Sequence, residues 1–138
     1  MIIDIAGLVV CDSAQLSEIR AVNRDGKRGA CFQAKKLLSG LVYDMSSLEN
    51  NPFTFPEVQT LLDGITAGGH KLSDQQQVLN LSVSWKHLIQ LVLLNGFVLN
   101  KTTFCNLHHL VAEEEVLTWG IFRDSQVYIS GTEFKPPS

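Results

Sequence analysis

The chain has few cysteines and few basic residues, and both shortages narrow what it can be. Its three cysteines, Cys11, Cys31 and Cys105, are too few and too widely spaced for a disulfide framework or a four-thiolate zinc site. The 11 Lys and Arg are outnumbered by 14 Asp and Glu, for a net charge of −3, whereas nucleic-acid binders gather positive charge on one face. We therefore expect a protein of the reducing cytoplasm that does not bind nucleic acid.

Long uninterrupted apolar runs are also missing. The apolar N-terminus is interrupted by Asp4, and it lacks the basic region that begins a secretory signal. The apolar run at 87–99 is broken by Asn95 and Gly96, and it is shorter than the roughly 20 residues that span a bilayer. The sequence therefore predicts no membrane association, and residues 1–27 are interpreted as an N-terminal tail or arm.

Helical periodicity is what the sequence does have. Apolar residues recur at steps of three and four over 28–48, which predicts an amphipathic helix ending at the Asn-Asn-Pro break of 50–52. Just beyond it, Thr54 and Glu57 form a T-x-x-E capping box. This box predicts a short helix that ends at Gly64.

Two more helices and a change of period follow. Ser73 and Gln76 form a second capping box, which predicts the start of the longest helix, and Asn100 is the expected N-cap of the last one. The helical period is then lost, and β-branched and aromatic residues flank a Ser-Gly turn within 121–135. The predicted fold class is mainly α, a small helical bundle with a short C-terminal β-hairpin.

Three blocks of sequence resemble the Fic (filamentation induced by cAMP) family. They are "MSSLENNPFTFPEVQTLL" at 45–62, "LSDQQQVLNLSVSWKHLIQLV" at 72–92, and "CNLHHLV" with "WGIFRDSQVYISGTEFKPP" at 105–111 and 119–137. Their order and spacing are similar to those of the family's inhibitory helix, following core helix and flap hairpin. The resemblance implies that 28–138 is the N-terminal helical region of a Fic protein, with the inhibitory helix at about 30–50 and the flap at about 121–135.

The resemblance assigns an inhibitory role to the end of the first helix. Fic proteins transfer AMP from ATP to hydroxyl side chains of target proteins, and a helix-terminal glutamate inhibits them by pairing with an arginine of the catalytic motif. Glu49 and Asn50 match the last two positions of the inhibitory pattern. Its Ser or Thr position holds Met45, with Ser46 alongside. Without the resemblance, Glu49 would be interpreted as a solvated residue beside a turn.

The flap of the family pairs its backbone with an extended stretch of the target, by β-augmentation at an open strand edge. The matching residues here are Arg123, Val127, Tyr128, Ile129, Ser130 and Gly131. By analogy Arg123 anchors the segment, although a surface pair with Asp124 or Glu133 is the simpler interpretation. A hairpin that packs on its own bundle is the alternative to target docking.

The catalytic signature of the family, H-x-F-x-x-G-N-G-R-x-x-R, is not in these 138 residues, and none of the four histidines is followed by it. ATP and Mg²⁺ are implied by the family, but this chain alone is expected to bind neither and to transfer no AMP. Two functions remain open. The chain is the regulatory and target-docking part of a Fic adenylyltransferase, autoinhibited through Glu49, or it is a non-catalytic, antitoxin-like inhibitor of a separate Fic protein. Expected partners are a target protein, a second copy of the chain or a separate Fic chain.

One further cluster has metal-ligand character. Cys105, His109 and Glu113 recur at every fourth position, on one face of the last predicted helix. Such a stripe is more typical of a packed cysteine and a hydrogen-bonded histidine, so no metal site is predicted.

Overall fold

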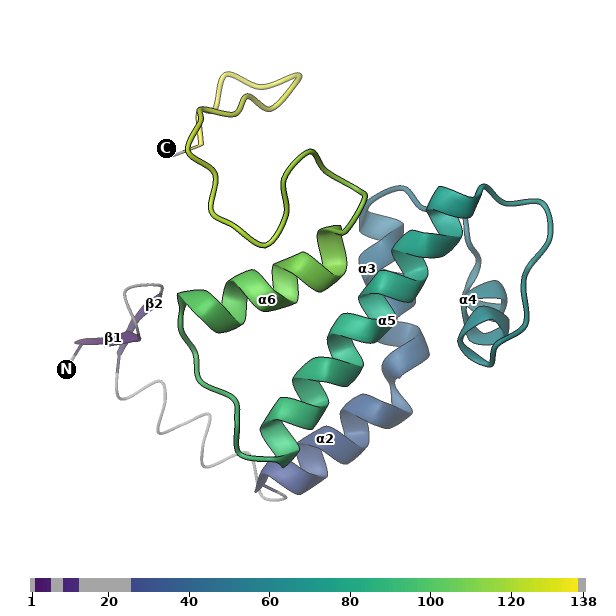
Figure 1. The fold of residues 1–138 in the computed structure, drawn as a ribbon, viewed down its shortest axis with the longest axis horizontal. Coiled ribbons are helices and arrows are strands. Elements are labelled where there is room, and N and C mark those ends of the chain that lie inside the picture. Colours follow the sequence, from purple (N-terminus) through teal and green to yellow (C-terminus); the bar gives the residue numbers. More distant parts are fainter. Residues whose placement is uncertain (1, 6–8, 13–25, 137–138) are drawn as a thin grey trace.

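The computed structural model describes residues 2–5, 9–12 and 26–136, and these are mainly helical, as predicted (Figure 1). The helices are α2 (Gly26–Lys36), α3 (Leu38–Leu48), α4 (Phe55–Leu62), α5 (Leu72–Leu93) and α6 (Lys101–Ala112). Two short strands, β1 (Ile2–Ile5) and β2 (Val9–Asp12), pair antiparallel with Ile2 opposite Asp12. The predicted tail or arm at 1–27 lies largely outside the described residues.

Helix α5 is the centre of the fold. It is 22 residues long, the longest of the described helices, and α2, α3, α4 and α6 all pack against it. Among the described helices, none is both long enough and apolar enough to cross a membrane. The central position of α5 brings the end of α3 and the start of the C-terminal segment to the same helix.

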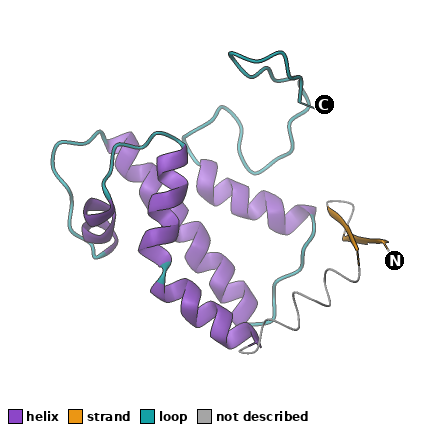
Figure 2. Ribbon diagram, turned by 180° about the vertical axis from the view of Figure 1, so that it is seen from behind, coloured by secondary structure: helices purple, strands orange, loops and turns teal. Residues whose placement is uncertain are grey.

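The predicted helix over 28–48 is in fact two helices, α2 and α3, separated at Leu37 (Figure 2). Helical hydrogen bonds continue on both sides of the break, since Leu37 N–H donates to the Gln33 carbonyl at 2.9 Å and Leu41 N–H donates to the Leu37 carbonyl at 2.9 Å. Ser39 and Gly40 follow the break, and Gly/Ser pairs are a common cause of sharp bends. Both helices contact α5.

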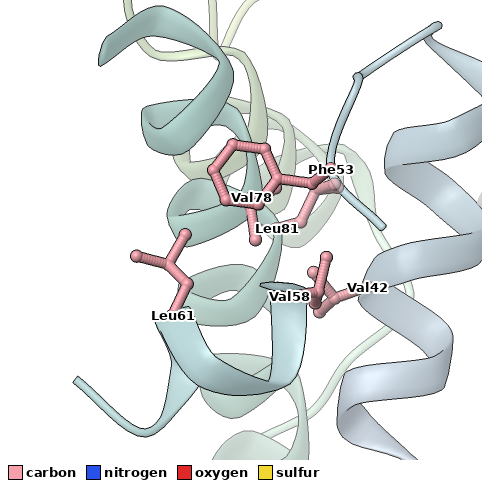
Figure 3. Packing of buried hydrophobic residues seen from close by; sticks show 6 residues of the cluster. All are labelled: Val42, Phe53, Val58, Leu61, Val78 and Leu81. Atoms are coloured by element: carbon pink, nitrogen blue, oxygen red, sulfur yellow. The ribbon is translucent and has the colours of Figure 1, made fainter. Parts of the chain in front are cut away.

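The hydrophobic core lies where α3, α4 and α5 meet (Figure 3). Its buried members are Val42, Phe53, Val58, Leu61, Val78 and Leu81. Phe53 comes from the α3–α4 connection and is only 3% exposed. The connection that follows Glu49 is therefore held to the core by its own aromatic side chain.

The predicted capping box of α4 is present. The Thr54 backbone N–H donates to Glu57 Oε2 at 2.8 Å, and the Thr54 hydroxyl donates to the same oxygen at 2.7 Å. The other carboxylate oxygen of Glu57 lies 3.0 Å from His70 Nε2, and the His70 ring stacks on Phe53 at 4.0 Å between centroids. Glu57 thus joins the start of α4 to the loop before α5.

These contacts predict a pH dependence of stability. The Thr54 hydroxyl, then His70 and the Thr54 backbone N–H, lower the pKa of Glu57 from 4.5 to about 2. A carboxylate with a lowered pKa in the folded state stabilises the fold above its unfolded pKa and loses that contribution as the pH falls to the folded value. The free energy of unfolding of wild type should exceed that of Glu57→Gln at neutral pH. We expect this difference to become smaller as the pH falls from about 5 to about 2. Urea unfolding across this range measures it. The exposed control Glu114→Gln should show no such narrowing.

The other two predicted helix starts differ in outcome. Helix α5 begins at Leu72 after Lys71, so Ser73 lies inside the helix and the predicted Ser73–Gln76 box is wrong. Lys71 has the extended backbone of an N-cap, and Gln76 instead donates to Asn80 Oδ1 at 2.8 Å. The cap of α6 is confirmed, because the Asn100 side chain accepts the Thr103 backbone N–H at 2.8 Å.

The predicted C-terminal β-hairpin is not seen as paired strands. Within the described part of this segment, 113–136, the backbone forms turns and coil without a strand. A turn at Ser130 and Gly131, where φ of Gly131 is +81°, reverses the chain, and Gln126 Nε2 donates to the Pro136 carbonyl at 2.7 Å. Residues 121–130 are all exposed, so no sheet or helix covers them, and an isolated two-stranded hairpin is marginal in water.

Candidate functional site

Glu49 follows the last residue of α3, as the resemblance requires. Its backbone N–H donates to the Ser46 carbonyl at 3.1 Å, which closes the helix end. The Glu49 side chain is exposed at this helix end. Within the described residues the Glu49 carboxylate has no hydrogen-bond or ion-pair partner. A carboxylate in this position is accessible to a cation on another segment or another chain.

Asn50 and Ser46, the other two residues assigned to the inhibitory pattern, have different surroundings. Asn50 is exposed and has a φ of +59°, a left-handed conformation that asparagine tolerates and that ends a helix. Ser46 is fully buried, and its hydroxyl donates to the Tyr43 carbonyl at 3.0 Å. The structure therefore presents Glu49 and Asn50 together at the surface, while Ser46 lies inside.

Asn51 is a residue that the sequence analysis missed. Its Oδ1 accepts the Phe53 backbone N–H at 3.0 Å, and its Nδ2 donates to the Asp74 carbonyl and to Gln77 Oε1, both at 2.8 Å. The side chain thus ties the turn after Glu49 to the first turns of α5. The available signal was the Asn-Pro pair, since asparagine before proline often bonds the backbone two residues ahead.

Gln77 extends this connection to the C-terminal segment. Its Nε2 donates to Glu115 Oε2 at 3.4 Å, and one turn along α5 the buried Asn80 donates to the Glu113 carbonyl at 3.0 Å. The turn that bears Glu49 and the start of the segment that contains the predicted flap are therefore attached to the same two turns of α5.

Met45, which stands where the inhibitory pattern has Ser or Thr, contacts α5 through its sulfur. The Trp85 indole N–H lies 3.1 Å from Met45 Sδ. Both residues line an almost wholly apolar hollow of about 370 Å³, whose other walls come from α5 and α6. At this position the end of α3 is thus held by a sulfur and ring contact instead of by a hydroxyl.

The predicted docking residues lie on the exposed coil at 121–135, here called the docking segment. Tyr128 is 75% exposed and Ile129 is 51% exposed, and Val127, Ser130 and Gly131 are exposed as well. At its start, the Phe122 ring stacks on Phe104 of α6 with 5.9 Å between centroids. This contact attaches the segment to α6, and the turn around Gly131 projects away from the helices (Figure 1).

The described residues contain no group of three or more His, Cys, Asp or Glu side chains that could hold a metal ion. The His109 ring instead lies beside Trp119, 6.3 Å between centroids. The neighbouring His108 accepts the Gly120 backbone N–H at Nδ1, at 3.0 Å. Both histidines therefore hold the chain that follows α6.

Comparisons with known protein families, with curated proteins and with solved structures give no match for this chain. The functional assignment therefore depends on the sequence motifs together with the geometry of Glu49 and of the docking segment.

Proposed function

We propose that this chain is the regulatory and target-docking part of a Fic-type adenylyltransferase, with Glu49 as its inhibitory residue. The observation that carries the proposal is the exposed Glu49 carboxylate, which is unpaired within the described residues and lies at the C-terminal end of α3. A carboxylate and an arginine form a strong, directional pair, so Glu49 is suited to bind the arginine of a catalytic motif.

The docking segment supports the second half of the proposal. Its backbone is not paired in a sheet, and its side chains at Val127, Tyr128 and Ile129 are exposed. An extended stretch of a target protein can add to such a segment by backbone hydrogen bonds, with apolar contacts from the alternate side chains. In this function the β-hairpin of the Fic-type bundle forms when the target pairs with it.

A second candidate is an inhibitor that acts on a separate Fic protein, since these 138 residues hold the inhibitory pattern without the catalytic signature. In both candidates Glu49 binds the same arginine, and they differ in whether that arginine belongs to the same polypeptide. Sequencing the transcript past the codon for Ser138 separates them. An in-frame H-x-F-x-x-G-N-G-R-x-x-R signature supports the first candidate, and a stop codon without it excludes the first and leaves the second.

A mixing assay tests the inhibitory role of Glu49. The chain is added to a Fic transferase whose own inhibitory glutamate is replaced by glycine, and transfer of labelled AMP to a target is measured. Wild-type chain should slow the transfer. Glu49→Gly should weaken this inhibition about tenfold to hundredfold, the worth of a hydrogen-bonded charge pair.

Two controls make the assay specific. Glu49→Gln keeps the size of the side chain and should behave like Glu49→Gly, because the pair needs the charge. Glu114→Gly removes an exposed carboxylate at a residue that already has a left-handed φ of +64°, and it should inhibit like wild type. Equal inhibition by wild type and Glu49→Gly excludes Glu49 from the mechanism.

A further inference from the structure

The hollow that Met45 and Trp85 line between α3, α5 and α6 has no role in the proposed function. Its volume is about 370 Å³, and sites for small molecules have volumes of roughly 300–1,000 Å³. Two residues of its wall, Met45 and Phe104, are exposed, so the hollow is accessible from solvent. It is therefore large enough and open enough to admit a small organic molecule.

The wall of this hollow is apolar and carries no permanent charge. Met45, Trp85 and Phe104 contribute a thioether and two aromatic rings, and no Asp, Glu, Lys or Arg is among the described residues that line it. Moving a charged group from water to such a wall is costly, whereas aromatic rings and a thioether make favourable contacts with another ring. The wall therefore favours a neutral molecule with an aromatic body.

The hydroxyl of Ser84 is a polar group on this wall that lacks a partner. Ser84 lines the hollow and is only 8% exposed, and within the described residues its hydroxyl makes no hydrogen bond. Two other polar atoms of the wall are already engaged, because the Trp85 indole N–H contacts Met45 Sδ and His108 Nδ1 accepts the Gly120 backbone N–H.

An unpaired hydroxyl in a buried position is unfavourable, and a water molecule is poorly suited to pair with this one. Buried waters typically make about three hydrogen bonds, and the apolar wall around Ser84 offers too few partners for that. A ligand with an apolar body fills the hollow by contact with its wall and needs only one polar atom for Ser84.

We propose that this hollow binds a small neutral aromatic molecule with one hydroxyl group, whose ring lies against Trp85 and Phe104 and whose oxygen pairs with the Ser84 hydroxyl. This inference is independent of the proposed function, because it concerns the isolated chain and requires neither a transferase nor Glu49.

Titration of the ¹⁵N-labelled chain with 2-naphthol, and with naphthalene as the analogue without the hydroxyl, tests the proposal. 2-Naphthol should shift the indole N–H signal of Trp85 in a saturable way. It should leave that of Trp119, which is not among the described residues that line the hollow, unchanged. Ser84→Ala should bind 2-naphthol about twofold to tenfold more weakly than wild type, as for the loss of one neutral hydrogen bond. Naphthalene should bind Ser84→Ala at least as tightly as it binds wild type.

Ser82→Ala is the matched control. Ser82 belongs to the same helix, is 1% exposed, and its hydroxyl also has no partner within the described residues, but it is not among those that line the hollow. Its affinity for 2-naphthol should equal that of wild type. The proposal is overturned by absence of a saturable Trp85 shift, or by equal affinity of wild type and Ser84→Ala for 2-naphthol. A similar loss for naphthalene in Ser84→Ala, or for 2-naphthol in Ser82→Ala, also overturns it.

Discussion

Phe53→Ala is expected to lower the free energy of unfolding by about 3–5 kcal/mol, the usual cost of removing a buried aromatic side chain. Phe53 is 3% exposed and lies in the cluster formed by α3, α4 and α5. It also supports the His70 ring, which stacks on it and contacts Glu57. Its removal therefore leaves a cavity and loosens the loop before α5. Denaturant unfolding followed by far-UV circular dichroism measures the loss.

The matched control for this prediction is Phe32→Ala in α2. Phe32 is 56% exposed and its ring contact is with Lys36, so its truncation should cost less than about 1 kcal/mol. If Phe53→Ala lowered the free energy of unfolding as little as Phe32→Ala does, the connection after Glu49 would not be part of the cooperative core.

Gly120→Ala should detach the C-terminal segment from α6 and leave the bundle folded. Gly120 has a φ of +72°, and a Cβ atom there would lie 2.9 Å from His109 Cβ. Left-handed backbone alone costs about 1–3 kcal/mol in a residue with a side chain, and the contact with His109 adds to that. We expect loss of the bond from Gly120 N–H to His108 Nδ1 and faster amide exchange at residue 120 and its neighbours.

Gly131→Ala is the natural comparison, because Gly131 also has a positive φ, +81°, but nothing lies within 4 Å of a Cβ built on it. This variant should change exchange only around the turn that contains residue 131. Hydrogen exchange read residue by residue separates the two effects. Equal behaviour of the two variants would mean that the contact with His109 does not hold the segment.

Short-range features of this fold were predictable from sequence. The caps at Thr54 and Asn100 depend on residues within three positions of each other, so their chemistry is visible in the sequence. The length and central place of α5 followed from one long periodic run. The predicted cap at Ser73 failed because Lys71, two residues earlier, already has the extended backbone of an N-cap.

Long-range features were not predictable. The break at Leu37 preserves the apolar period on both sides, so periodicity alone gives one helix. The links made by Asn51 cross 23 and 26 positions of sequence, and no local pattern encodes them. Residues 121–135 do have the β-branched and aromatic residues of a strand pattern. A strand also needs a partner strand, and the described part of the chain provides none there.

The candidate site shows the same division. The resemblance placed Glu49 at a helix end, and the structure has it there, exposed. Burial of Ser46 depends on the packing of α3 against the rest of the bundle, which sequence could not show. The hollow between α3, α5 and α6, whose lining includes Met45 and Ser84, results from the packing of α3 and α6 against α5. No sequence motif predicted it.

The hydrogen bonds of the Asn51 side chain limit how the inhibitory sequence can be transferred to another protein. Because its hydrogen bonds end on Asp74 and Gln77 of α5, the conformation of the turn after Glu49 depends on a helix that is distant in sequence. A synthetic peptide of residues 45–62 contains the complete motif but not that helix. Grafting the motif onto another scaffold therefore means transferring the first turns of α5 as well, and the smallest transferable unit is a piece of tertiary structure.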